Sequence, residues 1–399
     1  MLDRVERLCA GVLDAKTLRE QTLAELRRKL AFDGHVWALT DPVSRVGTSP
    51  LADVPGLSWE ELPRMVRWRY LSQGTRWTDL IQAKTRFISL REATAGDLGR
   101  SPGWREVQQA LGVVDVLTAA FWDRFGCWAW LDLWRTAPAQ PFTRPEQELL
   151  ASLVSVLTTG LRRSQARTFI PTPRMKPQAE GPAIMLLSPE LRVRLRTSAA
   201  QATLQRLNPP DDPDAAITAI PAAAYNVAAA LIAHEHGVPV GPPSSRVHLG
   251  AGRWVTLRAA RTATGDRSAD IAVSIEESTP AERLEVFGLA YGLSPREREV
   301  LSELATGADS RQLARRLVLS EHTVNDHVKA VLAKTGSPTT PGAADHITPI
   351  RLAPTVVAYL PEAYVVDSVT GTNWEGVGVA PDVVSPPDTV IETAVAALH

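Results

Sequence analysis

The chain has 399 residues, which is enough for two or three domains. Hydrophobic residues make up 44% of it and charged residues 22%, values typical of a soluble globular protein. The formal net charge is −1, so the composition as a whole favours neither a nucleic-acid nor a membrane partner, and any basic surface must be local. Cys9 and Cys127 lie in apolar contexts, which predicts buried thiols rather than a disulfide or a metal site and fits a reducing cytoplasm.

Nothing in the sequence predicts export or membrane insertion. The first ten residues, MLDRVERLCA, are charged and have a helical pattern, unlike a signal peptide. The longest apolar stretch, 215–233, is mostly alanine and contains Pro221, so it is a poor membrane span. We therefore expect a cytoplasmic protein with no membrane partner.

The first segment, residues 1–168, is predicted to run from helix to sheet to helix. Leucine and valine recur at helical spacing over residues 2–30, with a break near Gly11. A short strand is expected at 35–40, and the clearest strand pair follows at 113–121 and 126–135. A helix with a leucine-rich stripe is expected over 144–167.

The second strand of that pair is apolar on both faces, so it is expected in the middle of a sheet that is covered on both sides. Asp132 in this strand would then need a partner, because an isolated buried carboxylate is costly. One face of the strand carries Trp128, Trp130, Asp132 and Trp134.

The helix, sheet, helix order of residues 1–168 resembles a GAF-type sensory domain. The resemblance implies a small-molecule pocket, and Trp128, Trp130, Asp132 and Trp134 are its candidate lining. The same aromatic rings would equally fill a core, and core packing is the favoured interpretation, because pockets and cores share one composition.

Residues 169–180 contain three prolines and are predicted to form a linker. Residues 181–278 are predicted to contain two strands, an alanine-rich helix at 222–233, and three antiparallel strands, of which the first two form a hairpin around Gly250 and Gly252. This order resembles a PAS-type domain. His234 and His236 are metal ligands by type, but a complete site needs three or four ligands, so neither a metal nor a cofactor is predicted.

Residues 279–292 are predicted to form a short amphipathic connector helix, and residues 293–336 three further short helices. Ser294 caps the first of these three and forms a capping box with Glu297. Asp309 or Ser310 caps the second, and Ser320 caps the third. Only a few residues separate the second helix from the third, as in a helix-turn-helix, whose last helix lies in the DNA major groove.

The outward side chains of this segment are the candidate contacts to double-stranded DNA. Asn325 and Lys329 can read base edges or bind phosphates, while Ser320 and Thr323, with the free N–H groups of the helix start, suit a phosphate. The candidate DNA-binding residues are Ser310, Arg311, Ser320, Glu321, His322, Thr323, Asn325, Lys329 and Lys334.

The run LSPREREVL, then a glycine, then SRQLARRLVLSEHTVNDHVKAVLAKTG resembles the C-terminal DNA-binding domain of the LuxR family of bacterial transcription regulators. Many members carry a basic residue where this chain has Asn325. The family's fourth helix, used for dimerisation, should begin after Gly336. There the chain reads SPTTPGAADHITP, and Pro338 and Pro341 disfavour a helix.

The charge of residues 293–336 does not by itself identify DNA as the partner, because the segment has seven basic side chains and six acidic ones. A protein-interaction module whose helix-turn-helix no longer binds DNA is therefore the alternative for this segment. The order of the motif and the positions of the caps favour DNA binding.

Residues 337–399 differ in character, being rich in proline, glycine and predicted strands. From Asp345 onward seven acidic side chains stand against one basic side chain, so DNA phosphates would repel this tail. The stretch TGTNWEGVGVAPDVV is similar to the C-terminal end of the tail-processing serine peptidases. That family's catalytic serine and base lie further upstream, in segments that this chain lacks, so no catalytic residue is predicted.

Two origins of the tail stay open. In the first, a fusion or frameshift replaced the last helix of a regulator, and this is favoured because the junction falls where the fourth helix should start. In the second, an acidic appendage packs on this protein's own domains.

The sequence therefore predicts a multidomain α+β protein. GAF-like (1–168) and PAS-like (181–278) α/β sensory domains precede an all-α helix-turn-helix (293–336) and an irregular β-rich tail (337–399). We expect a transcription regulator without enzymatic activity. Its sensory domains would bind a small-molecule effector or a protein partner and would carry any homodimer. A serine-peptidase-related protein is the alternative that the tail alone favours.

Overall fold

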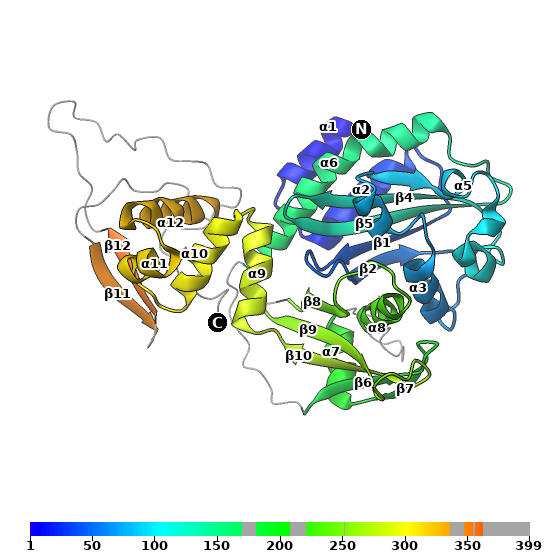
Figure 1. Cartoon of the computed structure of the whole chain (residues 1–399). Helices are drawn as coiled ribbons and strands as arrows, with labels where there is room; N and C mark the ends of the chain where they lie inside the picture. Colours follow the sequence, from blue (N-terminus) through cyan, green and yellow to red (C-terminus); the bar gives the residue numbers. More distant parts are fainter. Residues whose placement is uncertain (170–180, 208–220, 251, 336–346, 354–355, 362–399) are drawn as a thin grey trace. The chain divides into compact units, whose positions relative to one another are not determined.

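The computed structural model describes residues 1–169, 181–207, 221–250, 252–335, 347–353 and 356–361 (Figure 1). The chain divides into two compact units. Unit 1 comprises Met1–Ser164 and Met175–Ser278, and unit 2 comprises Gln165–Arg174 and Thr279–His399. The expected mixture of α and β structure is confirmed.

The first sheet of unit 1 has five antiparallel strands in the order β2-β1-β5-β4-β3. The predicted strand pair forms the long β4–β5 hairpin, and β5 lies in the middle of the sheet, as its two apolar faces predicted. The strands are β1 (Gly34–Thr40), β2 (Gly47–Asp53), β3 (Phe87–Ser89), β4 (Val113–Asp123) and β5 (Gly126–Thr136).

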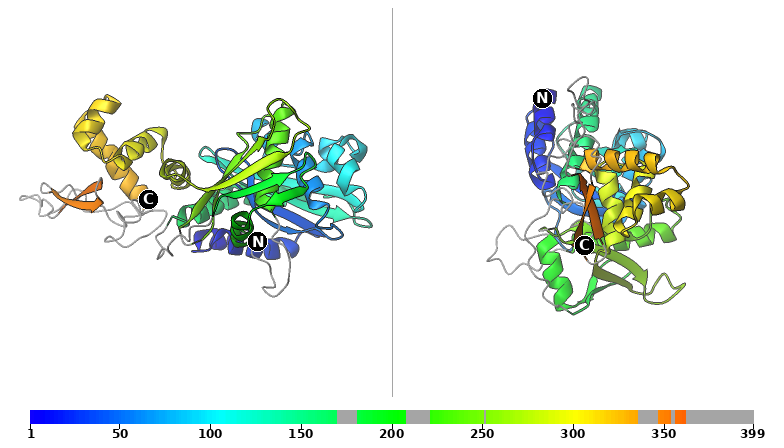
Figure 2. Two further views of the ribbon diagram at one scale, coloured as in Figure 1. Left: turned by 90° about the horizontal axis from the view of Figure 1, so that it is seen from below. Right: turned by 90° about the vertical axis from the view of Figure 1, so that its left-hand side faces the viewer.

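Helices cover both faces of this sheet (Figure 2). On one face, Trp77 stacks on Trp130 of β5 with ring centroids 5.1 Å apart. On the other, Gly160 lets two helices approach closely, because a Cβ there would lie 2.6 Å from Sγ of Cys9. The first face carries α3 (Leu62–Leu71), α4 (Trp77–Gln82) and α5 (Leu90–Ala93), and the second carries α1 (Leu2–Ala10), α2 (Ala15–Arg27) and α6 (Arg144–Arg167).

The predicted helix over residues 2–30 is confirmed as two helices. Their break follows Gly11, and Asp14 caps the second helix by accepting hydrogen bonds from the backbone N–H groups of Lys16 and Thr17. Between α5 and β4 the chain forms a 3₁₀ turn at Leu98–Arg100 and a π-helical turn at Trp104–Gln108.

The second sheet of unit 1 also has five antiparallel strands, in the order β7-β6-β10-β9-β8. Its strands are the predicted ones, namely β6 (Ala183–Leu187), β7 (Val193–Arg196), β8 (Ser244–His248), β9 (Trp254–Arg261) and β10 (Ile271–Glu277). Helices α7 (Ser198–Leu207) and α8 (Ala222–Glu235) stand between β7 and β8 in the chain.

The two sheets have the same strand order when each is numbered from its own first strand. Both then read 2-1-5-4-3, and in both the main helices follow the second strand. Unit 1 therefore contains one topology twice.

Helix α8 is the shared core of unit 1. It contacts α3 and β2 from the first half and β8, β9 and β10 from the second (Figure 1). Eleven of its 14 side chains are buried, and seven of these eleven are alanine, which lets strands and helices approach on several sides. The two segments that the sequence divides into separate domains thus pack into one compact unit.

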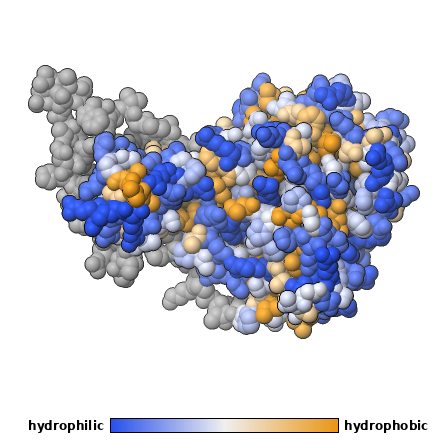
Figure 3. Space-filling model, in the orientation of Figure 1, coloured by the Kyte–Doolittle hydropathy of each residue, from blue (hydrophilic) through white to orange (hydrophobic). Residues whose placement is uncertain are grey.

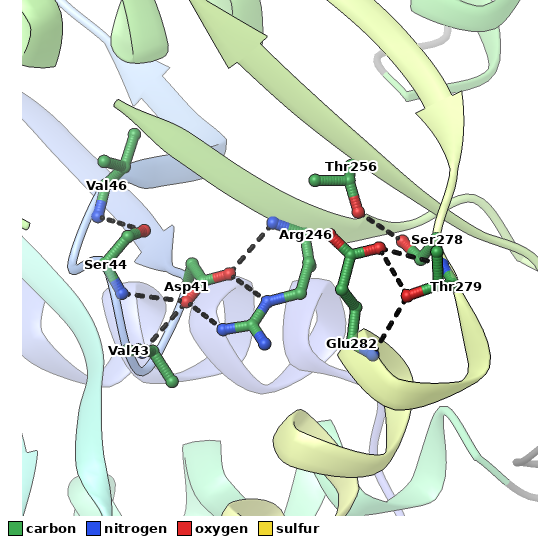
Figure 4. Close-up of polar contacts among 9 residues, drawn as sticks. All are labelled: Asp41, Val43, Ser44, Val46, Arg246, Thr256, Ser278, Thr279 and Glu282. Carbon is green, nitrogen blue, oxygen red and sulfur yellow. Dashed lines mark hydrogen bonds and ion pairs between the residues drawn. The ribbon is translucent and has the colours of Figure 1, made fainter. Parts of the chain in front are cut away.

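A buried ion pair adds a polar link between the two halves (Figure 4). Arg246 in β8 donates to the carboxylate of Asp41, which follows β1, with an Nε–Oδ2 distance of 2.7 Å and an Nη2–Oδ1 distance of 2.8 Å. The backbone N–H groups of Val43 and Ser44 also donate to Asp41. Burial acts to raise the pKa of Asp41, but the bonds from Arg246 outweigh it and hold the pKa below its ordinary value.

Unit 2 begins at Gln165, in the last turn of α6, and continues with α9 (Pro280–Ala290). Phe169 packs edge-on against Phe287 of α9, with ring centroids 5.4 Å apart. Thr279 and Glu282 form a capping box at the start of α9 (Figure 4). The helices that follow are α10 (Pro295–Ala305), α11 (Ser310–Leu317) and α12 (Glu321–Thr335).

The described part of the tail is a two-stranded antiparallel sheet, β11 (Ile347–Ala353) and β12 (Val356–Pro361). The segment that would hold the fourth helix, 336–346, and the peptidase-like stretch, 370–384, lie outside the described residues, and so do the predicted linker residues 170–180. Within the described part of the chain, no helix is both long and apolar enough to span a membrane.

Candidate nucleic-acid interface

Three helices of unit 2 pack around a small apolar core. Val300 from α10, Leu313 and Ala314 from α11 and Val324 from α12 are buried together with Ala308. Because these side chains face the core, the opposite faces of α11 and α12 point to solvent. In Figure 3 the visible surface of this region is mostly hydrophilic, with one small hydrophobic patch.

The predicted caps are confirmed at all three helix starts. Ser294 and Glu297 form a capping box on α10, and Asp309 with Gln312 forms one on α11. Of the two candidates for the second cap, Asp309 is therefore the residue used. Ser320 accepts a hydrogen bond from the backbone N–H of Thr323 at 3.0 Å, which leaves other N–H groups of the first turn of α12 available to a phosphate.

The turn between α11 and α12 is only three residues long. Its first residue, Val318, has φ of 55° and ψ of 53°, and the backbone N–H of Leu319 donates to the carbonyl of Ala314 at 2.9 Å. This left-handed residue ends α11 and turns the chain at once into α12. The arrangement is the helix-turn-helix that the sequence predicted.

The outward face of α12 carries five of the predicted DNA-binding residues together. His322 has 88% of its side chain exposed, and its Nε2 lies 3.5 Å from Oδ2 of Asp326 one turn later. A patch that mixes amide, imidazole, ammonium and carboxylate groups suits base edges and phosphates in combination. The exposed or half-exposed residues on it are Glu321, His322, Thr323, Asn325 and Lys329.

Two predicted residues at the start of α11 are tied to α12 by polar contacts. The hydroxyl of Ser310 donates to Oδ1 of Asn325 at 3.0 Å, and Nε of Arg311 lies 3.2 Å from Oε1 of Glu321. The structure thus brings the first turn of α11 and the first two turns of α12 into one surface.

Lys334 is placed elsewhere. Its ammonium group lies 2.6 Å from Oε2 of Glu297, whose side chain is only 8% exposed. Burial acts to raise the pKa of Glu297, but the hydrogen bonds from Lys334 and Ser294 outweigh it and hold the pKa below the ordinary value. Lys334 therefore joins α12 to α10 instead of extending the outward patch.

Arg315 is an exposed basic residue that the sequence analysis did not single out. Together with Arg311, one turn earlier, it lines an open groove beside the turn, along with Val318, Ser320 and Glu321. The four-residue spacing of the two arginines was the available signal, because such a pair lies on one helix face.

A second candidate site lies in unit 1, at the predicted tryptophan face. Asp132 has the partner that its burial requires, since Nε of Arg69 lies 2.7 Å from Oδ2 and the Thr118 hydroxyl donates to Oδ1 at 2.7 Å. Burial raises the pKa of Asp132 above its ordinary value, and Arg69 and Thr118 oppose this rise.

A hollow of about 30 Å³, with room for roughly two water molecules, lies beside this ion pair. Asp132 and Trp134 line it, whereas Trp128 and Trp130 do not, so the structure brings only half of the predicted set to one cavity. Nε1 of Trp134 and the Ser72 hydroxyl are buried there without a hydrogen-bond partner among the described residues. Apolar side chains such as Met65, Leu90 and Val107 also line the hollow, so its wall combines apolar surface with these polar groups.

In the described part of the chain, His, Cys, Asp and Glu side chains nowhere form a group that could hold a metal ion. His236, considered above as a ligand type, has its Nδ1 2.7 Å from the carbonyl oxygen of Ile232 at the end of α8.

No curated protein matches the chain. Residues 292–346 match the family model of bacterial regulatory proteins, luxR family, and the three helices of this segment are therefore a helix-turn-helix of the luxR type.

Proposed function

We propose that this protein is a transcription regulator that binds double-stranded DNA through α10–α12, with α12 in the major groove. The observation that carries the proposal is the luxR-type helix-turn-helix, whose α12 presents Asn325 and Lys329 outward beside the first turn of α11. The proposal places the protein in the cytoplasm, where DNA is accessible, and includes no catalytic step. The alternative is a protein-interaction module that does not bind DNA, and the following experiment distinguishes the two.

The Lys329→Ala substitution is expected to weaken binding to all DNA sequences alike and to lower the salt slope by about 1, because it removes one phosphate contact. The Lys334→Ala substitution is the matched control, since Lys334 is paired with Glu297 and its loss should leave the salt slope unchanged. The measurement is fluorescence anisotropy with labelled duplex DNA at several salt concentrations. Absence of binding by the wild-type chain at low salt would reject the proposal.

We further propose that unit 1 is a sensory unit with GAF-like and PAS-like halves. The repeated 2-1-5-4-3 strand order supports a relation between the halves. The hollow beside Asp132 supports a site for an effector group of only a few atoms, because the buried donors at Trp134 and Ser72 would gain hydrogen bonds from a polar group of that size. Dimerisation is assigned to unit 1, since Pro338 and Pro341 disfavour a helix after α12.

A thermal-shift screen of small polar compounds on the full chain tests the effector site. A ligand at 100 times its dissociation constant should stabilise the wild-type chain by about 2.7 kcal/mol. The Trp134→Phe substitution removes the unpaired N–H while keeping an aromatic ring, so it should reduce the stabilisation that the ligand gives. A hit whose effect survives Trp134→Phe unchanged would place the ligand elsewhere.

A further inference from the structure

The hydrogen bond between Ser310 and Asn325 crosses from one helix to another on the exposed surface. Ser310 is the first residue of α11, Asn325 lies in the second turn of α12, and the Oγ–Oδ1 distance is 3.0 Å. The apolar packing of the two helices runs through Leu313, Ala314 and Val324 and does not need this contact. The cap of α11 does not need it either, because Asp309 provides that cap.

An exposed asparagine without such a contact would sample several rotamers. Ordering one side chain of this kind on binding costs affinity, and a contact present before binding reduces that cost. Here the hydroxyl of Ser310 holds the carbonyl end of the amide, which fixes the direction in which the two Nδ2 hydrogens and the second lone pair of Oδ1 point. The amide is thereby oriented before any DNA is met.

We propose that Ser310 is a positioning residue for base recognition. It holds the amide of Asn325 toward the base edges of the major groove and does not itself bind a phosphate. Ser310 therefore sets how sharply one base pair is discriminated, while overall affinity is set by the phosphate contacts. This inference rests on the proposed function, that the helix-turn-helix binds DNA.

If Ser310 instead bound a phosphate directly, its substitution would have a different effect. A lost phosphate contact weakens binding to all sequences alike and lowers the salt slope. A lost positioning contact lowers the preference at a single base position and leaves the salt slope unchanged, because no charge and no counterion is involved. The two roles are thus separable by measurement on one set of variants.

The experiment begins with selection of preferred duplexes from a randomised library by the full-length chain. Dissociation constants are then measured for the preferred site and for single-base changes at each position. The variants are Ser310→Ala, Ser310→Thr, Asn325→Ala and the double variant Ser310→Ala/Asn325→Ala. Ser302→Ala is the matched control, because Ser302 is an exposed serine on α10. Circular dichroism checks that each variant keeps its helices.

We expect Asn325→Ala to abolish the preference at one position and Ser310→Ala to reduce it there about 3- to 10-fold. Ser310→Thr keeps the hydroxyl and should retain the preference, and the double variant should behave as Asn325→Ala alone. The inference is overturned if Ser310→Ala leaves that base preference intact, or if it weakens binding to all sequences alike and lowers the salt slope. It is also overturned if Ser310→Ala has its full effect in a chain that already carries Asn325→Ala. A wild-type chain that binds no DNA would instead reject the proposed function itself.

Discussion

Val318 is a β-branched residue in a backbone conformation that glycine and asparagine normally occupy. Its φ is 55°, yet 88% of the residue is exposed, so no burial offsets the steric cost of the left-handed region. Val318 is the first of the three residues that connect α11 to α12, and its left-handed backbone turns the chain between the two helices.

Substituting Val318→Gly is expected to stabilise the helix-turn-helix by about 0.5–1 kcal/mol, since the relieved strain exceeds the added freedom of the unfolded chain. The check is slower amide hydrogen exchange in α11 and α12 of the full chain. Val318→Ala keeps the left-handed penalty, so it should change exchange little. Faster exchange in the glycine variant would show that the valine is not strained.

The ion pair between Lys334 and Glu297 makes the stability of the helix-turn-helix depend on pH. Because the pKa of Glu297 is held below its ordinary value of 4.5, the stability from this pair is fully present above about pH 4.5 and is lost as pH falls through the lowered pKa.

We expect Lys334→Ala to destabilise unit 2 by about 1–2 kcal/mol at pH 7, a reduced value for a buried pair because Lys334 is partly exposed. The difference in unfolding free energy between the Lys334→Ala variant and the wild-type chain should be smaller at pH 3.5. Scanning calorimetry of the full chain at both pH values measures it, with Lys329→Ala as the control from the exposed face. A difference of equal size at both pH values would contradict the assignment.

At the scale of elements, α8 is held by a buried hydrogen-bond network as well as by its alanines. The hydroxyl of Tyr70 in α3 accepts from the backbone N–H of Gly47 in β2 and donates to Oδ1 of Asn226 in α8, both at 3.0 Å. The amide of Asn226 also donates to the carbonyl of Ala222 at 2.8 Å, so this side chain has little freedom to move.

The Gly47→Ala substitution tests that network. A Cβ at position 47 would lie 2.5 Å from Oδ1 of Asn226, so the helix or the strand must shift, and we expect a loss of about 1–3 kcal/mol in the free energy of unfolding. Gly181→Ala is the control, since no atom lies within 4 Å of a Cβ there. The measurement is urea unfolding followed by tryptophan fluorescence. Equal midpoints for the two variants would show that the contact is easily relieved.

The elements that the sequence predicted well are those with local signals. The β4–β5 hairpin followed from apolar runs, and the starts of α10, α11 and α12 followed from their capping residues. The segment between β2 and β4 carried no clear period, so α3, α4 and α5 were not predicted. The position of α8 between two sheets had no signal either, because a helix that is apolar all round does not show which surfaces it contacts.

The candidate site divides in the same way. The outward face of α12 could be predicted from helical spacing, whereas the partners of Lys334 and Asn325 depend on how α12 crosses α10 and α11. The ion pair of Asp41 with Arg246 joins residues that are far apart in the chain, so no local sequence pattern could predict it.

At the scale of the molecule, the two halves of unit 1 are expected to depend on each other for stability. A fragment of residues 1–168 would expose the surfaces of α3 and β2 that α8 covers and would leave Asp41 buried without Arg246. We therefore expect this fragment to melt at a lower temperature than unit 1 in the full chain, and co-expression with residues 175–278 to restore the melting temperature. Deletion of residues 337–399 is the control and should leave unit 1 unchanged. A fragment that melts like the full chain would refute the dependence.

The placement of α8 also has a consequence during synthesis on the ribosome. The last strand of the first sheet, β5, ends at Thr136, and the helix that covers part of that half begins at Ala222. At about 5–20 residues per second, the ribosome needs roughly 5–20 s to translate the intervening segment. Throughout that interval the nascent chain carries uncovered apolar surface on α3, where Val66 and Tyr70 later pack against α8. Slower translation between these two points would prolong the exposure, so the yield of folded protein in the cell should depend on codon choice and chaperone supply within this window.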